Sequence, residues 1–235
     1  MTSPRQVARL AGIAYLVTVL TGLFAELFVR GNLIVSGNAV ATARNILGAE
    51  SLYRAGFAAD LIGSAAYVVV TLLLYELLKP VNRSLSLLAA FFSLVGVAVG
   101  GLAALGHLAP LFLLKGAPYL STFTPAQLQT LAYFALKMHA QGYLVALVFF
   151  AFYELILGYL IFKSGFFPRL LGILVAIGGA AFLINSFALF LAPAIGNALN
   201  GYMLALDGAG EISLTLWLLA FGVNATRWQE AAARR

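Results

Sequence analysis

Six long apolar stretches follow one another along the chain, separated by short polar segments that contain glycine, proline, lysine and arginine. Within residues 143–162, for example, Glu154 is the one charged residue. Apolar runs of about 20 residues are typical of helices that cross the hydrocarbon core of a bilayer. The pattern therefore predicts six membrane spans, at about residues 7–29, 53–79, 84–114, 138–162, 170–191 and 206–227.

A shorter periodic segment lies between the first two spans. Asn38 can cap a helix over residues 39–48, in which Val40, Ala43 and Leu47 share one face. Ten helical residues are too few to cross a membrane. We therefore expect this helix to lie on the outer membrane surface.

A second helix start is predicted at Thr124, with Pro125 at the first helical position and Gln127 three residues after the cap. An unbroken helix from residue 125 to 162 would be about 57 Å long, whereas a hydrocarbon core is about 30 Å thick. Either residues 125–136 form a surface helix outside the membrane, or the helix bends near Gly142.

The composition confirms that lipid is the solvent of this chain. Hydrophobic residues make up 63% and charged residues 9% of the 235 residues, and the mean hydropathy is +0.99. Soluble domains carry roughly 25% charged residues. Cysteine is absent, which excludes disulfides, thiolate metal ligands and a cysteine nucleophile. The net charge of +6 comes from scattered lysines and arginines with no basic stripe, which argues against nucleic-acid binding.

The basic residues predict the orientation. Cytoplasmic loops of membrane proteins are enriched in lysine and arginine. Nine basic residues fall on one side of the six predicted spans and five on the other: Arg5, Arg9, Lys79, Arg83, Lys163, Arg169, Arg227, Arg234 and Arg235 against Arg30, Arg44, Arg54, Lys115 and Lys137. We predict an all-α, polytopic membrane protein: a single six-transmembrane-helix bundle over residues 1–235, with both termini cytoplasmic, in the inner membrane of a bacterium.

Four segments resemble a bacterial membrane family known as domain of unknown function 4386. They are residues 41–46 (ATARNI), 74–82 (LYELLKPVN), 157–169 (LGYLIFKSGFFPR) and 218–224 (LLAFGVN), and the resemblance covers nearly the whole chain. The third segment is the most specific, because a transmembrane composition alone would not dictate it. The resemblance implies a multi-pass membrane protein and carries no catalytic residue over to this chain.

Ionisable residues within the spans are the candidate functional groups, because their burial in lipid is costly. We expect Glu26 to pair with Arg30, Asp60 or Glu211 with Lys137, and His139 with Glu211. Helical spacing places His139 about 200° from Lys137, so that only one of the two can face the bundle. Two further glutamates, Glu76 and Glu154, are expected to pair with the inner bases Lys79, Lys163 or Arg169.

The main functional hypothesis is an outward-facing polar pocket that binds or moves a small or lipidic molecule. Its predicted lining is Glu26, Arg54, Asp60, His139 and Glu211. One alternative is a metal-dependent intramembrane hydrolase that uses His107 and His139, although no local ligand motif supports it. The other is a non-catalytic accessory subunit whose polar residues only hold helices together. The lipid bilayer is the expected partner, no cofactor is predicted, and the sequence leaves open both enzymatic activity and homo-oligomerisation.

Overall fold

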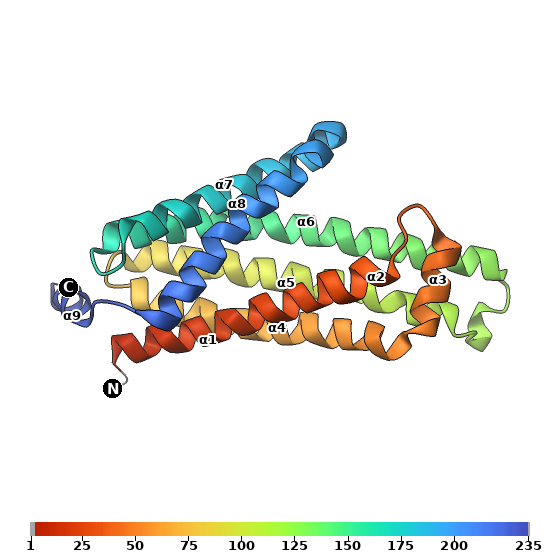
Figure 1. Ribbon diagram of the computed structural model, residues 1–235, viewed down its shortest axis with the longest axis horizontal. Helices are drawn as coiled ribbons and strands as arrows, with labels where there is room; N and C mark the ends of the chain where they lie inside the picture. The colour runs from red at the N-terminus through yellow and green to blue at the C-terminus, as the bar shows by residue number, and fades with distance from the viewer. Residues whose placement is uncertain (1–2, 235) are drawn as a thin grey trace. The chain divides into compact units, whose positions relative to one another are not determined.

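The computed structural model describes residues 3–234, and these residues contain helices and turns but no strand. Figure 1 shows the chain with its α-helices labelled. In chain order they are α1 (Pro4–Leu23), the π-helix η1 (Phe24–Arg30), α2 (Gly31–Leu33), α3 (Ala39–Gly48), α4 (Glu50–Leu78), α5 (Arg83–Leu114), the short η2 (Pro118–Leu120), α6 (Pro125–Ser164), α7 (Arg169–Leu191), α8 (Pro193–Ala220) and α9 (Ala225–Ala233).

Six helical stretches are long and apolar enough to cross a membrane, as the sequence predicts. They are Pro4–Leu33, which joins α1, η1 and α2, and the helices α4, α5, α6, α7 and α8. Their outward faces are apolar: Leu102 and Leu191, for example, are 70% and 81% exposed. Such surfaces are stable only against lipid or another apolar partner.

Local signals in the sequence account for two helix starts. The Asn38 side chain accepts a hydrogen bond from the amide of Ala41 at the start of α3. At α6 the Thr124 amide donates to Gln127 Oε1 at 2.8 Å and the Gln127 amide donates to Thr124 Oγ1 at 3.3 Å. This reciprocal pair is a capping box, in which each side chain satisfies an amide that the helix leaves free.

The helix boundaries differ from the predicted spans at two places. Residues 125–136 are not a separate surface helix, because α6 continues unbroken through Gly142 for 40 residues. That length is about 60 Å, so part of α6 extends beyond a hydrocarbon core of about 30 Å. The segment between the predicted spans 170–191 and 206–227 is also helical, since Pro193 opens α8, and α8 ends at Ala220 rather than near residue 227.

The chain divides into two compact units, and α1, α4, α5 and α6 contribute residues to both. Unit 1 contains the described residues up to Val17, then Ala66–Val97, and Val145 onward. Unit 2 contains Thr18–Ala65 and Ala98–Leu144.

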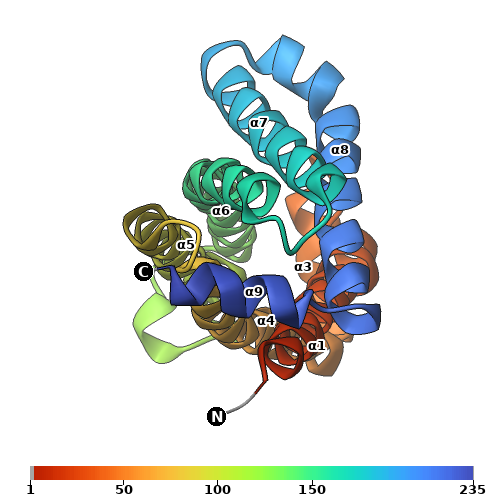
Figure 2. The same ribbon diagram turned by 90° about the vertical axis from the view of Figure 1, so that its left-hand side faces the viewer.

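Within unit 1, α7 and α8 lie side by side (Figure 2). Glycines allow close backbone approach between α6 and α7: a Cβ at Gly172 would lie 2.6 Å from the carbonyl oxygen of Gly158. At one end of the unit, Gly222 adopts a φ of +67° and a Cβ there would be 3.2 Å from Arg5 Cγ. The first turn of α1 and the end of α8 are therefore neighbours.

The C-terminal helix α9 closes the same end of unit 1. The Asn224 amide donates to the Phe166 carbonyl, and the Trp228 indole donates to the Leu77 carbonyl at 2.8 Å. Arg227 also donates to the carbonyl of Gly165. These bonds join α9 to the last turn of α4 and to the connection that follows α6.

The core of unit 2 is formed by apolar residues from six elements. Its buried members come from η1, α2, α3, α4, α5 and α6 and are Val29, Leu33, Ile46, Tyr53, Leu111 and Leu136. Because Ile46 of α3 is fully buried in this cluster, the short helix is part of the core rather than a peripheral attachment.

Candidate functional site

Three carboxylates from two helices meet in unit 1. Glu154 of α6 and Asp207 and Glu211 of α8 each place an oxygen within 4.8 Å of the others. We call these three residues the acidic cluster. Asp207 and Glu211 are four residues apart on α8 and so share one helical face, as their spacing requires.

The acidic cluster is buried and lacks a positive partner. Glu154 is 2% and Asp207 4% exposed. Neither oxygen of Glu154, nor Oδ1 of Asp207, has a hydrogen-bond partner, and no ion pair among residues 3–234 includes a member of the cluster. Two carboxylate charges at 4.8 Å repel by about 3 kcal/mol at an effective dielectric of 20. The arrangement therefore needs positive charge inside it, as a proton or a cation.

Two glycines of α7 make room for the acidic cluster. A Cβ at Gly178 would lie 3.1 Å from Asp207 Oδ1 and 3.4 Å from Glu154 Oε2, and one at Gly179 would lie 2.8 Å from Glu154 Cβ. The carboxylates thus rest against the bare backbone of α7. The glycine pair at 178–179 is the sequence feature that permits this approach, but the pair at 100–101 shows that glycines alone do not identify which helices meet, since a Cβ at Gly101 has nothing within 4 Å.

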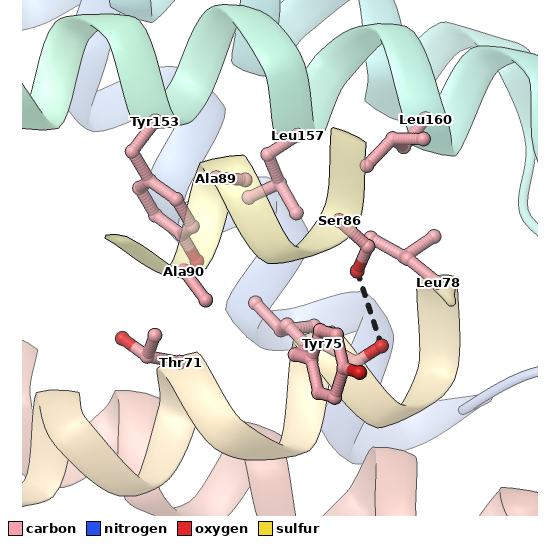
Figure 3. A pocket seen from close by; sticks show the side chains of 10 residues that line it. Thr71, Tyr75, Leu78, Ser86, Ala89, Ala90, Tyr153, Leu157 and Leu160 are labelled. Atoms are coloured by element: carbon pink, nitrogen blue, oxygen red, sulfur yellow. Dashed lines mark hydrogen bonds between the residues drawn. The ribbon is translucent and has the colours of Figure 1, made fainter. Parts of the chain in front are cut away.

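Three tyrosines of unit 1 form a series of contacts that begins at the acidic cluster. The Tyr15 hydroxyl donates to Glu211 Oε1 at 2.9 Å. The Tyr15 ring is 5.6 Å from that of Tyr67, which in turn is 6.1 Å from that of Tyr153. Tyr153 lines a small cavity between α4, α5 and α6, whose polar lining includes Thr71 and Ser86 (Figure 3). With a volume of about 10 Å³, the cavity is just large enough for one water molecule.

A different constellation occupies unit 2. Asp60 of α4, His107 of α5 and His139 of α6 each offer one possible ligand atom, and these atoms lie within 4.8 Å of one another. We call these three residues the histidine cluster. His107 is fully buried and His139 is 8% exposed.

Arg30 connects the histidine cluster to Glu26. Its guanidinium donates twice to Asp60, at 2.6 and 3.2 Å, and once to Glu26 at 2.6 Å. The same group lies 3.4 Å from His107 Nδ1. Arg30 ends the π-helical segment η1, and such segments are frequent at functional sites.

The structure places three of the five predicted pocket residues in this network and the other two elsewhere. Glu26, Asp60 and His139 are joined through Arg30 and His107 in unit 2. Arg54 is half-exposed and pairs with Glu50, and Glu211 belongs to the acidic cluster of unit 1. None of the five residues lines the cavity of Figure 3 or the surface hollow beside Lys79 and Trp228.

The predicted ion pairs have mixed outcomes. Glu26 with Arg30 and Glu76 with Lys79 are confirmed. Lys137 as the partner of Asp60 is wrong, because Asp60 binds Arg30 while Lys137 is exposed, its ammonium over the Tyr133 ring.

The predicted pairing of Glu154 with an inner base is also wrong. Lys163 is nine residues further along α6, which is about 14 Å of helix and beyond the reach of the two side chains.

Comparison with known proteins gives a family but no activity. A family model described as "Domain of unknown function (DUF4386)" matches residues 10–222. An uncharacterized protein of Archaeoglobus fulgidus is 26% identical over 159 residues, which cover 66% of this chain and 76% of that protein. No solved structure matches. Function must therefore be inferred from the two clusters.

Proposed function

The chain belongs to the DUF4386 family, and from the geometry of unit 1 we propose that it is a proton-linked membrane carrier, in which the acidic cluster takes up and releases the coupling proton as a small or lipidic molecule moves. The observation that carries the proposal is Glu154: a carboxyl group buried in an apolar bundle, with neither oxygen bonded and two further carboxylates within 4.8 Å. Ionisable groups within membrane spans commonly form ion pathways and proton relays.

A proton suits this cluster because it relieves the repulsion and creates a bond at once. A protonated carboxyl of Glu154 can donate to a carboxylate neighbour, as in other paired carboxyl sites that share one proton. Losing that proton restores the repulsion and leaves unpaired charge in a buried position. Proton binding is thereby linked to the packing of α6 against α7 and α8.

Tyr15, Tyr67 and Tyr153 form a line of ring contacts between the acidic cluster and the cavity of Figure 3, in which the Tyr15 hydroxyl donates to Glu211 and the buried Tyr153 hydroxyl has no hydrogen-bond partner. Hydroxyl groups can accept and donate protons in turn, so this line is the proposed proton path within unit 1. The count of basic residues supports cytoplasmic termini and an inner-membrane location as part of the same proposal.

Infrared difference spectroscopy on the purified protein, recorded between acidic and alkaline buffer, tests the proposal. We expect a carbonyl-stretch band from a protonated carboxyl group, which Glu154→Gln removes or shifts. Glu76→Gln is the matched control, since Glu76 is a partly exposed glutamate of unit 1 that is paired with Lys79. In liposomes, protein-dependent proton movement driven by a membrane potential should also fall in Glu154→Gln and persist in Glu76→Gln.

Two results would overturn the proposal. One is a carboxyl band that is identical in wild type and Glu154→Gln, when both elute as the same species from a sizing column. The other is a cluster that changes its spectrum on adding Na⁺ or Ca²⁺ at constant pH and not on changing pH, which would make it a metal-cation site instead.

A further inference from the structure

The histidine cluster of unit 2 has the donor set and the support of a transition-metal site. Two imidazoles and one carboxylate, from α5, α6 and α4, hold their ligand atoms within 4.8 Å of one another. Two nitrogens and an oxygen are a common three-ligand set for Zn²⁺, with a fourth position left to water or another ligand. The cluster is independent of the acidic cluster on which the proposed function rests.

Backbone carbonyls fix the ring orientation of both histidines. His107 Nε2 lies 3.2 Å from the Tyr53 carbonyl and His139 Nδ1 lies 2.9 Å from the Ala103 carbonyl. A carbonyl oxygen accepts hydrogen bonds and cannot donate them, so each of these nitrogens carries the hydrogen. The remaining nitrogens, His107 Nδ1 and His139 Nε2, therefore hold lone pairs.

This tautomer pattern is the one found in metal sites, where a ligating histidine donates its other N–H to a carbonyl or carboxylate. The His107 ring is further fixed by Tyr53, whose ring stacks on it with centroids 4.2 Å apart. The Tyr53 hydroxyl also donates to the His107 carbonyl. Both rings are thus held in place before any ligand arrives.

Arg30 shows that the site accepts positive charge. Its guanidinium binds Asp60 twice and lies 3.4 Å from the lone-pair nitrogen of His107. It also binds Glu26, an exposed carboxylate that can remain paired with the guanidinium when a metal ion binds Asp60. Arg30 therefore has a second partner one helical turn away.

We propose that the histidine cluster binds one divalent transition-metal ion, with Zn²⁺ as the best match, through Asp60, His107 and His139, and that the metal displaces Arg30 from Asp60 onto Glu26. The exchange makes Arg30 a built-in competitor, because one carboxylate cannot be fully shared between a guanidinium and a metal ion. Removing either imidazole lowers the affinity for the metal ion, and removing the competing guanidinium of Arg30 raises it.

Zn²⁺ titration of the purified full-length protein tests the proposal, with a chromophoric chelator as the competitor and elemental analysis after desalting. We expect one Zn²⁺ per chain. His139→Gln should weaken binding by at least about tenfold. Glutamine can still donate to the Ala103 carbonyl, so the fold should persist. Asp60→Asn is the second ligand variant. The control is Glu50→Gln, which alters another α4 carboxylate that binds Arg54 and Lys115.

Arg30→Gln separates the metal site from a merely structural network. A metal site predicts a lower Zn²⁺ dissociation constant in this variant, since a competing positive charge is gone. Substitution of Zn²⁺ by Co²⁺ gives an absorption spectrum that should change in His139→Gln and stay the same in Glu50→Gln. Absence of stoichiometric Zn²⁺ in wild type, or equal affinity in wild type, His139→Gln and Asp60→Asn, would overturn the proposal.

Discussion

Tyr15→Phe is the most direct probe of the acidic cluster. The substitution keeps the ring, which is 1% exposed and packs edge to face on Tyr67, and removes only the hydroxyl that donates to Glu211 Oε1 at 2.9 Å. A hydrogen bond to a neutral group contributes about 0.5–1.5 kcal/mol and one to a charged group about 1.5–3 kcal/mol. Because Tyr15 is buried, water cannot replace the lost donor, and we expect a loss of about 1–3 kcal/mol in unfolding free energy.

The sign of the change in unfolding free energy caused by Tyr15→Phe should depend on Glu211. In a Glu211→Met background the Tyr15 hydroxyl has lost its acceptor, so removing it abolishes a buried unpaired donor. Tyr15→Phe should then be neutral or stabilising. Titration of the micelle-bound protein with a denaturing detergent gives the four free energies of the cycle, and Tyr159→Phe, at a half-exposed tyrosine of the same unit, is the control. An equal cost of Tyr15→Phe in both backgrounds would refute the reasoning.

Two further predictions concern packing and orientation. Gly172→Ala should destabilise the protein by about 1–3 kcal/mol, because its Cβ would lie 2.6 Å from the Gly158 carbonyl oxygen, whereas Gly201→Ala, with nothing within 4 Å, should be neutral or stabilising in the same denaturation assay. Since the chain has no cysteine, Ser121→Cys and Ser84→Cys can be labelled singly with a membrane-impermeant maleimide in intact cells. Cytoplasmic termini predict labelling at 121 only, and the reverse pattern would invert the topology.

The helices were largely predictable because their causes are local. Apolar runs specify the spans, Asn38 specifies the start of α3, and the spacing of Glu26 and Arg30 specifies their pair. The length of α6 was the exception. A capped helix start followed by 40 residues without a breaker is what the sequence contains, but the thickness of a bilayer argued for a break that the structure does not have.

The meeting of side chains from different helices was much less predictable. Periodicity shows which residues share a face of one helix, and it predicted that only one of His139 and Lys137 could face the bundle; in the structure His139 is buried and Lys137 is exposed. It does not show which helices are neighbours. The sequence therefore predicted Lys137, rather than Arg30, as the ion-pair partner of Asp60. It also predicted that Glu154 pairs with an inner base, whereas Glu154 lies in the acidic cluster against the glycines of α7.

The order of synthesis gives α9 a particular consequence. Chains emerge from the ribosome N-terminus first, so the residues that bind the end of α4 and the connection after α6 are made later than both of those segments. Unit 1 cannot form these contacts until translation has passed Trp228. A nascent chain that stalls before Trp228 would leave that end of the unit without its bonds to Leu77 and Gly165.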